Sequence, residues 1–201
     1  AVMRRHADSA HLQERACGAL RNLTTGKEQN NSRARITGAF EAVVAAMRGH
    51  AACEGLQERA CGVLRNLTAS SEVENETQAR LVGGIDAVVM VMHGHKSSEK
   101  VQASACTALR NIIGSNAENA TQAGIVGAVE AITAAMHRHP GSARVQEHAC
   151  GAMYALISGN KANKARARRV GAQALTVSAM KAHPGNKRVL KEARDLLEQI
   201  M

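Results

Sequence analysis

Three asparagines with the same neighbours recur along the chain at a nearly constant spacing. Asn22, Asn66 and Asn111 each follow an arginine and precede Leu or Ile, and they stand 44 and 45 residues apart. A carboxamide offers one hydrogen-bond donor and one acceptor, the same two groups that an extended peptide backbone offers in return. A row of such side chains can therefore hold a strand-like ligand and leave the side chains of that ligand free.

Arginines beside these asparagines add a second kind of chemistry. Each asparagine directly follows an arginine, and two more arginines lie one helical stripe away: Arg21, Arg65, Arg110, Arg15 and Arg59. The planar guanidinium group pairs with carboxylate or phosphate through two parallel hydrogen bonds. On a solvated face Arg15 and Arg59 can instead pair with Glu14, Glu58 or other helix neighbours, and both interpretations stay open at this stage.

The asparagines and arginines belong to a repeat that runs through the whole chain. Residues 12–24 read LQERACGALRNLT and residues 56–68 read LQERACGVLRNLT, and four cysteines keep nearly the same step: Cys17, Cys61, Cys106 and Cys150. Aromatic residues are almost absent, with one Phe, one Tyr and no Trp, so many small apolar cores are favoured over one large core. A continuous period of about 44 residues predicts a solenoid.

Breaks rich in Gly, Pro and Asn divide each repeat into three segments. None of the segments alternates in the way that strands do, and Ala, Leu, Glu, Arg and Met dominate, so all three are predicted to be helices. Winding residues 12–25 as a helix places Leu12, Cys17 and Leu20 on one side and Arg21 and Asn22 on the other. The fold class is therefore expected to be all-α.

The chain resembles the armadillo-repeat family over its whole length. The resemblance rests on three helices per unit of about 44 residues, on [ACV]LRN[LI] near the end of the third, and on a glycine before the second. It implies a single domain, with residues 1–24 as part of one repeat and 25–69, 70–114, 115–158 and 159–201 as complete repeats. It also implies a right-handed superhelix whose third helices line a concave groove.

In this family an asparagine near the end of each third helix binds the backbone of an extended peptide, so the resemblance implies this role for Asn22, Asn66 and Asn111. Importin-like members carry Trp four residues before the asparagine, where this chain has small residues: Gly18, Gly62, Thr107 and Gly151. The Arg-Asn pattern is similar to catenin-like repeats instead. The resemblance therefore implies a non-catalytic scaffold that binds an acidic or phosphorylated peptide.

The positive charge of the chain is concentrated in the last repeat. The densest run of basic residues lies in the segment NKANKARARRV, at Lys161, Lys164, Arg166, Arg168 and Arg169. Such a patch attracts acidic partners, nucleic acid or anionic surfaces at long range. Because no aromatic residues interleave with it, stacking on bases is not supported. We expect a solvated end of the domain, and the alternative is an adaptor that docks a folded partner or nucleic acid there.

The histidines and cysteines of the sequence, which often form metal or catalytic sites, do not predict such a site here. Successive histidines stand a repeat apart, too far to share a metal ion, and mark the expected end of each second helix: His50, His95, His139 and His183. The repeated cysteines fall on the apolar stripe, while Cys53 falls in a loop. Neither a phosphate-binding loop nor a catalytic grouping is present in the sequence, so no enzyme activity, cofactor or metal is expected.

The sequence also leads to expectations about the cellular compartment and about the ends of the chain. The N-terminal segment has no apolar signal region and no stretch is long enough to span a bilayer, so a cytoplasmic or nuclear protein with reduced cysteines is expected. The sequence begins inside a predicted second helix and without Met, which suggests a piece of a longer array. An exposed apolar end at residue 1 would also permit end-to-end self-association.

Overall fold

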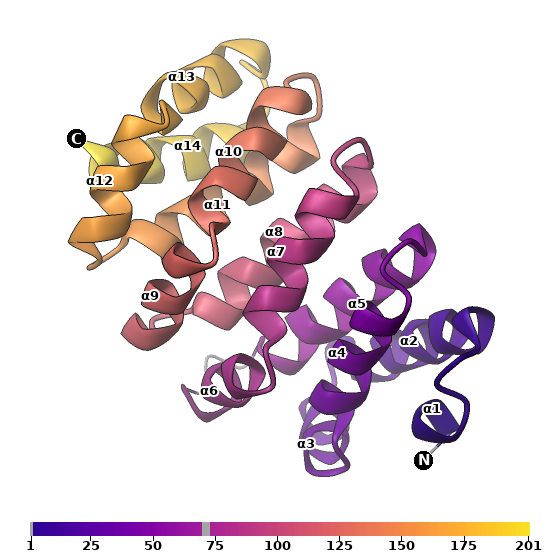
Figure 1. Ribbon diagram of the computed structural model, residues 1–201. Helices are drawn as coiled ribbons and strands as arrows, with labels where there is room; N and C mark the ends of the chain where they lie inside the picture. Colours follow the sequence, from indigo (N-terminus) through magenta and orange to yellow (C-terminus); the bar gives the residue numbers. More distant parts are fainter. Residues whose placement is uncertain (1, 70–72) are drawn as a thin grey trace.

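The computed structural model describes residues 2–69 and 73–201, and in these ranges the only regular structure is helical. The helices follow one another as a stack of short rods (Figure 1). They are α1 (Val2–Arg5), α2 (Ala10–Thr24), α3 (Glu28–Ile36), α4 (Ala39–Gly49), α5 (Glu54–Leu67), α6 (Val73–Leu81), α7 (Gly84–Gly94), α8 (Glu99–Ile113), α9 (Ala117–Ile125), α10 (Ala128–Arg138), α11 (Ala143–Ile157), α12 (Lys161–Arg169), α13 (Ala172–Ala182) and α14 (Lys187–Ile200). The expected repeat boundary at 69/70 touches residue 70, outside the described residues.

From α3 onward the helices form units of three: a short first helix, a longer second helix and a third helix of 14 or 15 residues. The third helices α2, α5, α8, α11 and α14 pack side by side in chain order and share the most extensive contacts in the molecule. The second helices α4, α7, α10 and α13 form a parallel layer in front of them (Figure 1). The third helices thus form one continuous layer, and we refer to the exposed face of this layer as the groove.

A glycine with positive φ starts each complete second helix. Gly38, Gly83, Gly127 and Gly171 have φ between 76° and 87°, a region in which residues with a Cβ atom are strained. The turn at these glycines lets the short first helix end and the second helix leave in a new direction. The regular recurrence of these glycines in the sequence is thus explained by the left-handed backbone conformation that each turn requires.

The core runs without interruption between the layers and consists mainly of Ala, Val, Leu, Ile, Met and Cys. Phe40 is the sole large ring within it, and it is fully buried in α4. Cys17, Cys61, Cys106 and Cys150 are buried free thiols, as the apolar stripe predicted. Within the described ranges, no helix has the length and apolarity needed to cross a membrane.

A buried glutamine in four successive third helices joins each of them to the second helix before it. Each glutamine Nε2 donates to two carbonyl oxygens at the end of that second helix: Gln13, Gln57, Gln102 and Gln146. Gln102, for example, donates to the carbonyls of Met92 and His95, each at 2.9 Å. The carbonyl of each histidine also accepts from a backbone N–H three residues on, as His95 does from Ser98, so the glutamine is needed most by the methionine carbonyl at the helix end. The sequence analysis did not identify this role.

The repeated histidines tie each repeat to the one before it. They are the C-cap residues of α4, α7, α10 and α13, which confirms their predicted place at the helix ends. Each Nε2 lies 2.7–2.9 Å from a loop carbonyl of the preceding repeat, for His50, His95, His139 and His183. The regular spacing of histidine therefore follows from the stacking of the repeats.

Candidate functional site

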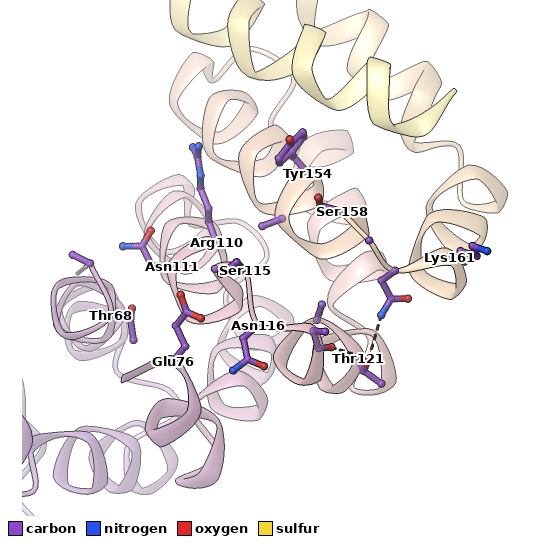
Figure 2. A pocket seen from close by; sticks show the side chains of 17 residues that line it. Thr68, Glu76, Arg110, Asn111, Ser115, Asn116, Thr121, Tyr154, Ser158 and Lys161 are labelled. Atoms are coloured by element: carbon purple, nitrogen blue, oxygen red, sulfur yellow. Dashed lines mark hydrogen bonds between the residues drawn. The ribbon is translucent and has the colours of Figure 1, made fainter. Parts of the chain in front are cut away.

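The predicted arginines and asparagines lie on three adjacent third helices, α2, α5 and α8. At the end of α8, Arg110 and Asn111 open into a cavity of about 790 Å³ that extends to the ends of α11 and the starts of α9 and α12. Tyr154 of α11 lies across this cavity from Asn111 (Figure 2). The cavity connects the end of the predicted asparagine row with Lys161 of the basic segment.

Asn66 is buried, and its carboxamide is used inside the protein. Its Nδ2 donates to the Arg21 carbonyl at 3.0 Å and lies 3.1 Å from the hydroxyls of both Thr24 and Thr25. Its Oδ1 accepts from the side chain of Arg65, at 2.9 Å from Nη2. The side chain of Asn66 therefore braces the stacking of α5 on α2.

Asn111 and Asn22 differ from Asn66 in which side-chain hydrogen-bonding groups have no partner among the described residues. The Asn111 Nδ2 donates to the Arg65 carbonyl at 3.0 Å, which repeats the brace one unit further on. In the described part of the chain no hydrogen bond reaches its Oδ1, and none reaches the exposed side chain of Asn22. One face of the Asn111 carboxamide and both faces of Asn22 thus stay available in the groove.

Two of the predicted arginines form ion pairs between neighbouring third helices. Arg59 Nη2 lies 3.1 Å from Glu14 Oε1, and Arg21 Nη1 lies 3.4 Å from Glu58 Oε1. Glu14 and Glu58 are the acids that were expected to pair with arginines of their own helix. Each ion pair instead joins two adjacent repeats. Since both partners of each pair are partly exposed, these pairs position the guanidinium groups more than they stabilise the fold. Arg15 is exposed and has no ion pair among the described residues.

Glycines of the third helices make room for these arginines. A Cβ atom on Gly62 would lie 2.8 Å from Cδ of Arg21, and one on Gly151 would lie 2.6 Å from Nη1 of Arg110. The Arg110 guanidinium is also held by Glu192 Oε1 at 3.0 Å. Gly62 and Gly151 are therefore covered by an arginine from the preceding repeat, whereas Gly18 is covered by Arg59 of the following repeat.

Arg65 breaks this pattern. The residue that corresponds to Gly62 in the next repeat is Thr107, whose side chain occupies the equivalent place. Arg65 bonds to the neighbouring Asn66 and has no carboxylate partner among the described residues. Burial lowers the pKa of Arg65, and the nearby Arg21 and Arg144 lower it further.

Two residues of α11 that the sequence analysis did not identify join this part of the groove. Arg144 is exposed near the start of the helix and His148 is half-buried one turn later. Burial lowers the pKa of His148, and the neighbouring Arg144, Arg110 and Arg65 add to that effect. The repeat pattern did carry a signal for them, because Arg144 corresponds to Lys100 and Arg188 in other units, and His148 corresponds to the predicted Arg15 and Arg59.

Glu76 adds an acid to the lining of the large cavity. Only 1% of the residue is exposed, and within the described residues its Oε2 has no hydrogen-bond partner. Burial raises the pKa of its carboxyl group, while the backbone N–H of Ser115 lowers it. Its carboxylate lies against Gly114, where a side chain would collide with it (Figure 2). Glu76 was missed because other repeats carry Ser32, Ala120 or Lys164 at this place.

Some of the basic side chains on α12 form ion pairs and hydrogen bonds within the protein. Arg166 pairs with Glu130 and donates to the Gly124 carbonyl, and Arg168 donates to the carbonyls of Ile200 and Met201. The other predicted members of this patch are solvent-facing to differing degrees: Lys161, Lys164 and Arg169. The free charge of the patch is therefore smaller than its composition indicated.

Solved structures with the same architecture cover nearly the whole chain. An engineered protein of the Northeast Structural Genomics Consortium matches with a TM-score of 0.83 and 25% identity, over 96% of this chain and 76% of that one. A designed armadillo repeat protein in complex with the peptide (KR)4 matches with a TM-score of 0.78 and 23% identity, over 94% and 75%. No curated protein matches the chain significantly.

The model of a known repeat family, described as the LRRK2 ARM repeat, matches residues 25–201. These residues comprise the four units of three helices that form the solenoid. The protein thus belongs to the armadillo-repeat family, in the group described as LRRK2 ARM repeats.

Proposed function

We propose that the chain is a non-catalytic scaffold whose third-helix groove binds an extended peptide segment with acidic or phosphorylated residues. One observation carries the proposal: arginines of the third helices lie across the helix that follows, Arg21 against Gly62 of α5 and Arg110 against Gly151 of α11. In keeping with this, Arg21 and Arg144 both lower the pKa of Arg65. Cations held this close repel one another, and an anionic ligand relieves that repulsion.

A similar architecture can hold a peptide, since the designed relative is in complex with (KR)4. That peptide is basic, whereas the groove of this chain carries Arg15, Arg21, Arg65 and Arg110. The net charge of the chain is +9. Electrostatic complementarity therefore favours a ligand of the opposite charge here.

The asparagines contribute unequally to this proposal. Asn22 and the free Oδ1 of Asn111 are the groups that would bond to the backbone of the segment. Asn66 would act through its neighbour instead, because its Oδ1 holds the guanidinium group of Arg65 in the groove. A ligand would thus meet two carboxamides and a positioned arginine.

Peptide binding is tested by fluorescence anisotropy with an acidic peptide, a basic peptide of the same length and a DNA duplex, each at two salt concentrations. The groove variant combines Arg15→Gln with Arg65→Gln, because neither arginine has a carboxylate partner that the change would orphan. The matched control combines Lys164→Gln with Arg169→Gln on α12, which removes the same charge.

The groove variant is expected to bind the acidic peptide about tenfold more weakly, as the loss of one or two charge-assisted hydrogen bonds predicts. The control should bind like the wild type. If the duplex binds best, and only the α12 variant loses that binding, the alternative of docking through the basic last repeat is correct instead. Tighter binding of the basic peptide would contradict the proposed charge preference directly.

A further inference from the structure

The groove holds a cluster of positive groups that have no matching acids. Arg21 is paired with Glu58 and Arg110 with Glu192. By contrast, Arg65 and Arg144 have no carboxylate partner in the described ranges. Arg65 lies on α5 and Arg144 on α11, on either side of α8.

His148 lies on α11 one turn after Arg144, and both residues line the same cavity. Arg144, Arg110 and Arg65 all lower the pKa of His148. Glu147, beside it on α11, has the opposite effect.

Helix α14 supplies the remaining charges around the histidine. Lys187 and Arg188 line a cavity of about 600 Å³ together with Arg144, Glu147 and His148. Glu192 also belongs to α14, and its carboxylate is taken by Arg110. The other helices packed on α11 contribute no titratable group to this cavity. Among the described residues that line this cavity, Glu147 is therefore the one acid, against the three cations Arg144, Lys187 and Arg188.

We propose that Arg144, His148 and Arg188, which line one cavity, form a subsite for the phosphate group of a phosphorylated residue in the bound segment. This inference rests on the proposed function, because the segment would reach the subsite by lying along the third helices. It names phosphate as the group that the groove would recognise, and the residues that would bind it.

A phosphate monoester suits the subsite better than a carboxylate does. It carries close to two negative charges and three acceptor oxygens, so it can accept from two guanidinium groups and one imidazolium at once. A carboxylate has one charge and two oxygens, and it would leave part of the repulsion among the cations in place. The phosphorylated residue should therefore bind more tightly than glutamate at the same position.

Binding should also draw a proton onto His148. In the free protein, burial and the surrounding arginines keep the pKa of His148 below its ordinary value, so the ring is mainly neutral at pH 7. A bound phosphate favours the charged ring and raises this pKa. Affinity should consequently rise as the pH falls from 8 towards 6.5, and level off as the phosphate itself takes up a proton near pH 6.

The test uses isothermal titration calorimetry at pH 7 in two buffers with different ionisation enthalpies, which measures the protons taken up on binding. Three forms of one acidic peptide carry Thr, Glu or phosphothreonine at a single position. The variants are His148→Gln and, as a matched control, His137→Gln on the outer helix α10. Both changes remove one imidazole, but only the first lies in the groove.

The phosphothreonine form is expected to bind at least tenfold more tightly than the Glu form and to take up roughly half a proton. The uptake should disappear in His148→Gln and persist in His137→Gln. Equal affinity for the Glu and phosphothreonine forms, or equal proton uptake in the two variants, would overturn the subsite. Tighter binding of phosphoinositide vesicles than of the peptide would overturn its assignment to a phosphorylated protein segment.

Inorganic phosphate separates the subsite from the proposed function. Its addition should shift the titration of the His148 ring, followed by NMR, to higher pH. If that shift occurs while no peptide binds, the subsite exists and the peptide function is wrong. If acidic peptides bind in the groove and phosphate leaves the titration unchanged, the proposed function holds and this inference fails.

Discussion

At the scale of single residues, the same side chain type serves the fold in one repeat and stays available in another. The Asn66 carboxamide bonds to the Arg21 carbonyl and to Arg65, whereas Asn22 projects into solvent. Asn66 bonds to α2, the third helix beside it, while no hydrogen bond reaches the Asn22 side chain from the described residues. A motif can therefore recur faithfully while its chemical role changes.

The cysteines should separate into one reactive and four protected thiols. Burial raises the pKa of Cys17, Cys61, Cys106 and Cys150 to about 12, so almost none of these thiols is ionised at pH 8. Cys53 is half-buried at the N-cap of α5. We expect one thiol per native molecule to react quickly with iodoacetamide, and mass spectrometry of peptides should locate it at Cys53.

Unfolding in urea before labelling provides the control, because all five cysteines should then react. Rapid modification of Cys106 in the native protein would contradict the burial of the third-helix stripe.

The glutamine brace is expected to contribute substantially to stability. Gln102→Ala leaves the buried carbonyl of Met92 without its donor, while the His95 carbonyl keeps the Ser98 N–H, and the unfolding free energy should fall by about 1–3 kcal/mol. Urea denaturation followed by circular dichroism measures this change. Gln122→Ala on α9, where the side chain is partly exposed, is the matched control and should alter stability by less than about 0.5 kcal/mol. Similar losses in both variants would remove the special role of the brace.

At the scale of helices, small residues on the third helices allow side chains of the preceding repeat to cross them. Arg21 lies over Gly62 and Arg110 over Gly151, where a Cβ atom would be too close. Thr107 interrupts the series, and Arg65 then turns to Asn66. The glycines thus arrange the charges of the groove, which is a different use from the left-handed turns between first and second helices.

Those left-handed turns lead to a prediction about one glycine. Gly127 has φ of 87° and the nearest outside atom to an added Cβ would lie 3.8 Å away, so Gly127→Ala introduces backbone strain without a collision. Stability should fall by about 1–2 kcal/mol. Gly141→Ala, with open space and no positive φ, should be neutral or slightly stabilising. Thermal unfolding of both variants checks the contrast, and an equal effect would argue against strain at Gly127.

At the scale of the whole molecule, burial is uneven along the stack. In α2 only Gln13, Cys17 and Thr24 are buried, and 56% of Leu23 is exposed. In α8 and α11 each apolar stripe is covered from both sides by neighbouring third helices. Because a solenoid is held together by contacts between neighbours, its stability should vary from unit to unit.

Hydrogen exchange should reveal this gradient. Amides of α1 and α2 are expected to exchange at least tenfold faster than those of α8 and α11, since less apolar surface must be exposed to open them. Mass spectrometry of peptides after timed exchange measures the difference. Uniform protection across α2, α8 and α11 would show that the stack opens as one cooperative unit instead.

Much of the fold could be predicted from the sequence because each repeat encodes its own local structure. The cysteine stripe, the glycines before the second helices and the histidines after them mark helix faces and ends in every unit, and these depend on near neighbours in the chain. A period of about 44 residues then requires stacking, since no unit buries its apolar face alone.

The tertiary structure alone decided which charges meet. Arg59 with Glu14, Arg110 with Glu192, and His148 among the arginines all join different repeats. Their proximity depends on the twist between units and on the reach of long side chains, neither of which the repeat pattern records. The sequence by itself determined an all-helical armadillo solenoid with arginines and asparagines on its third helices. Stacking determined which of those groups remain free for a ligand, because each unit satisfies part of the polar surface of the next.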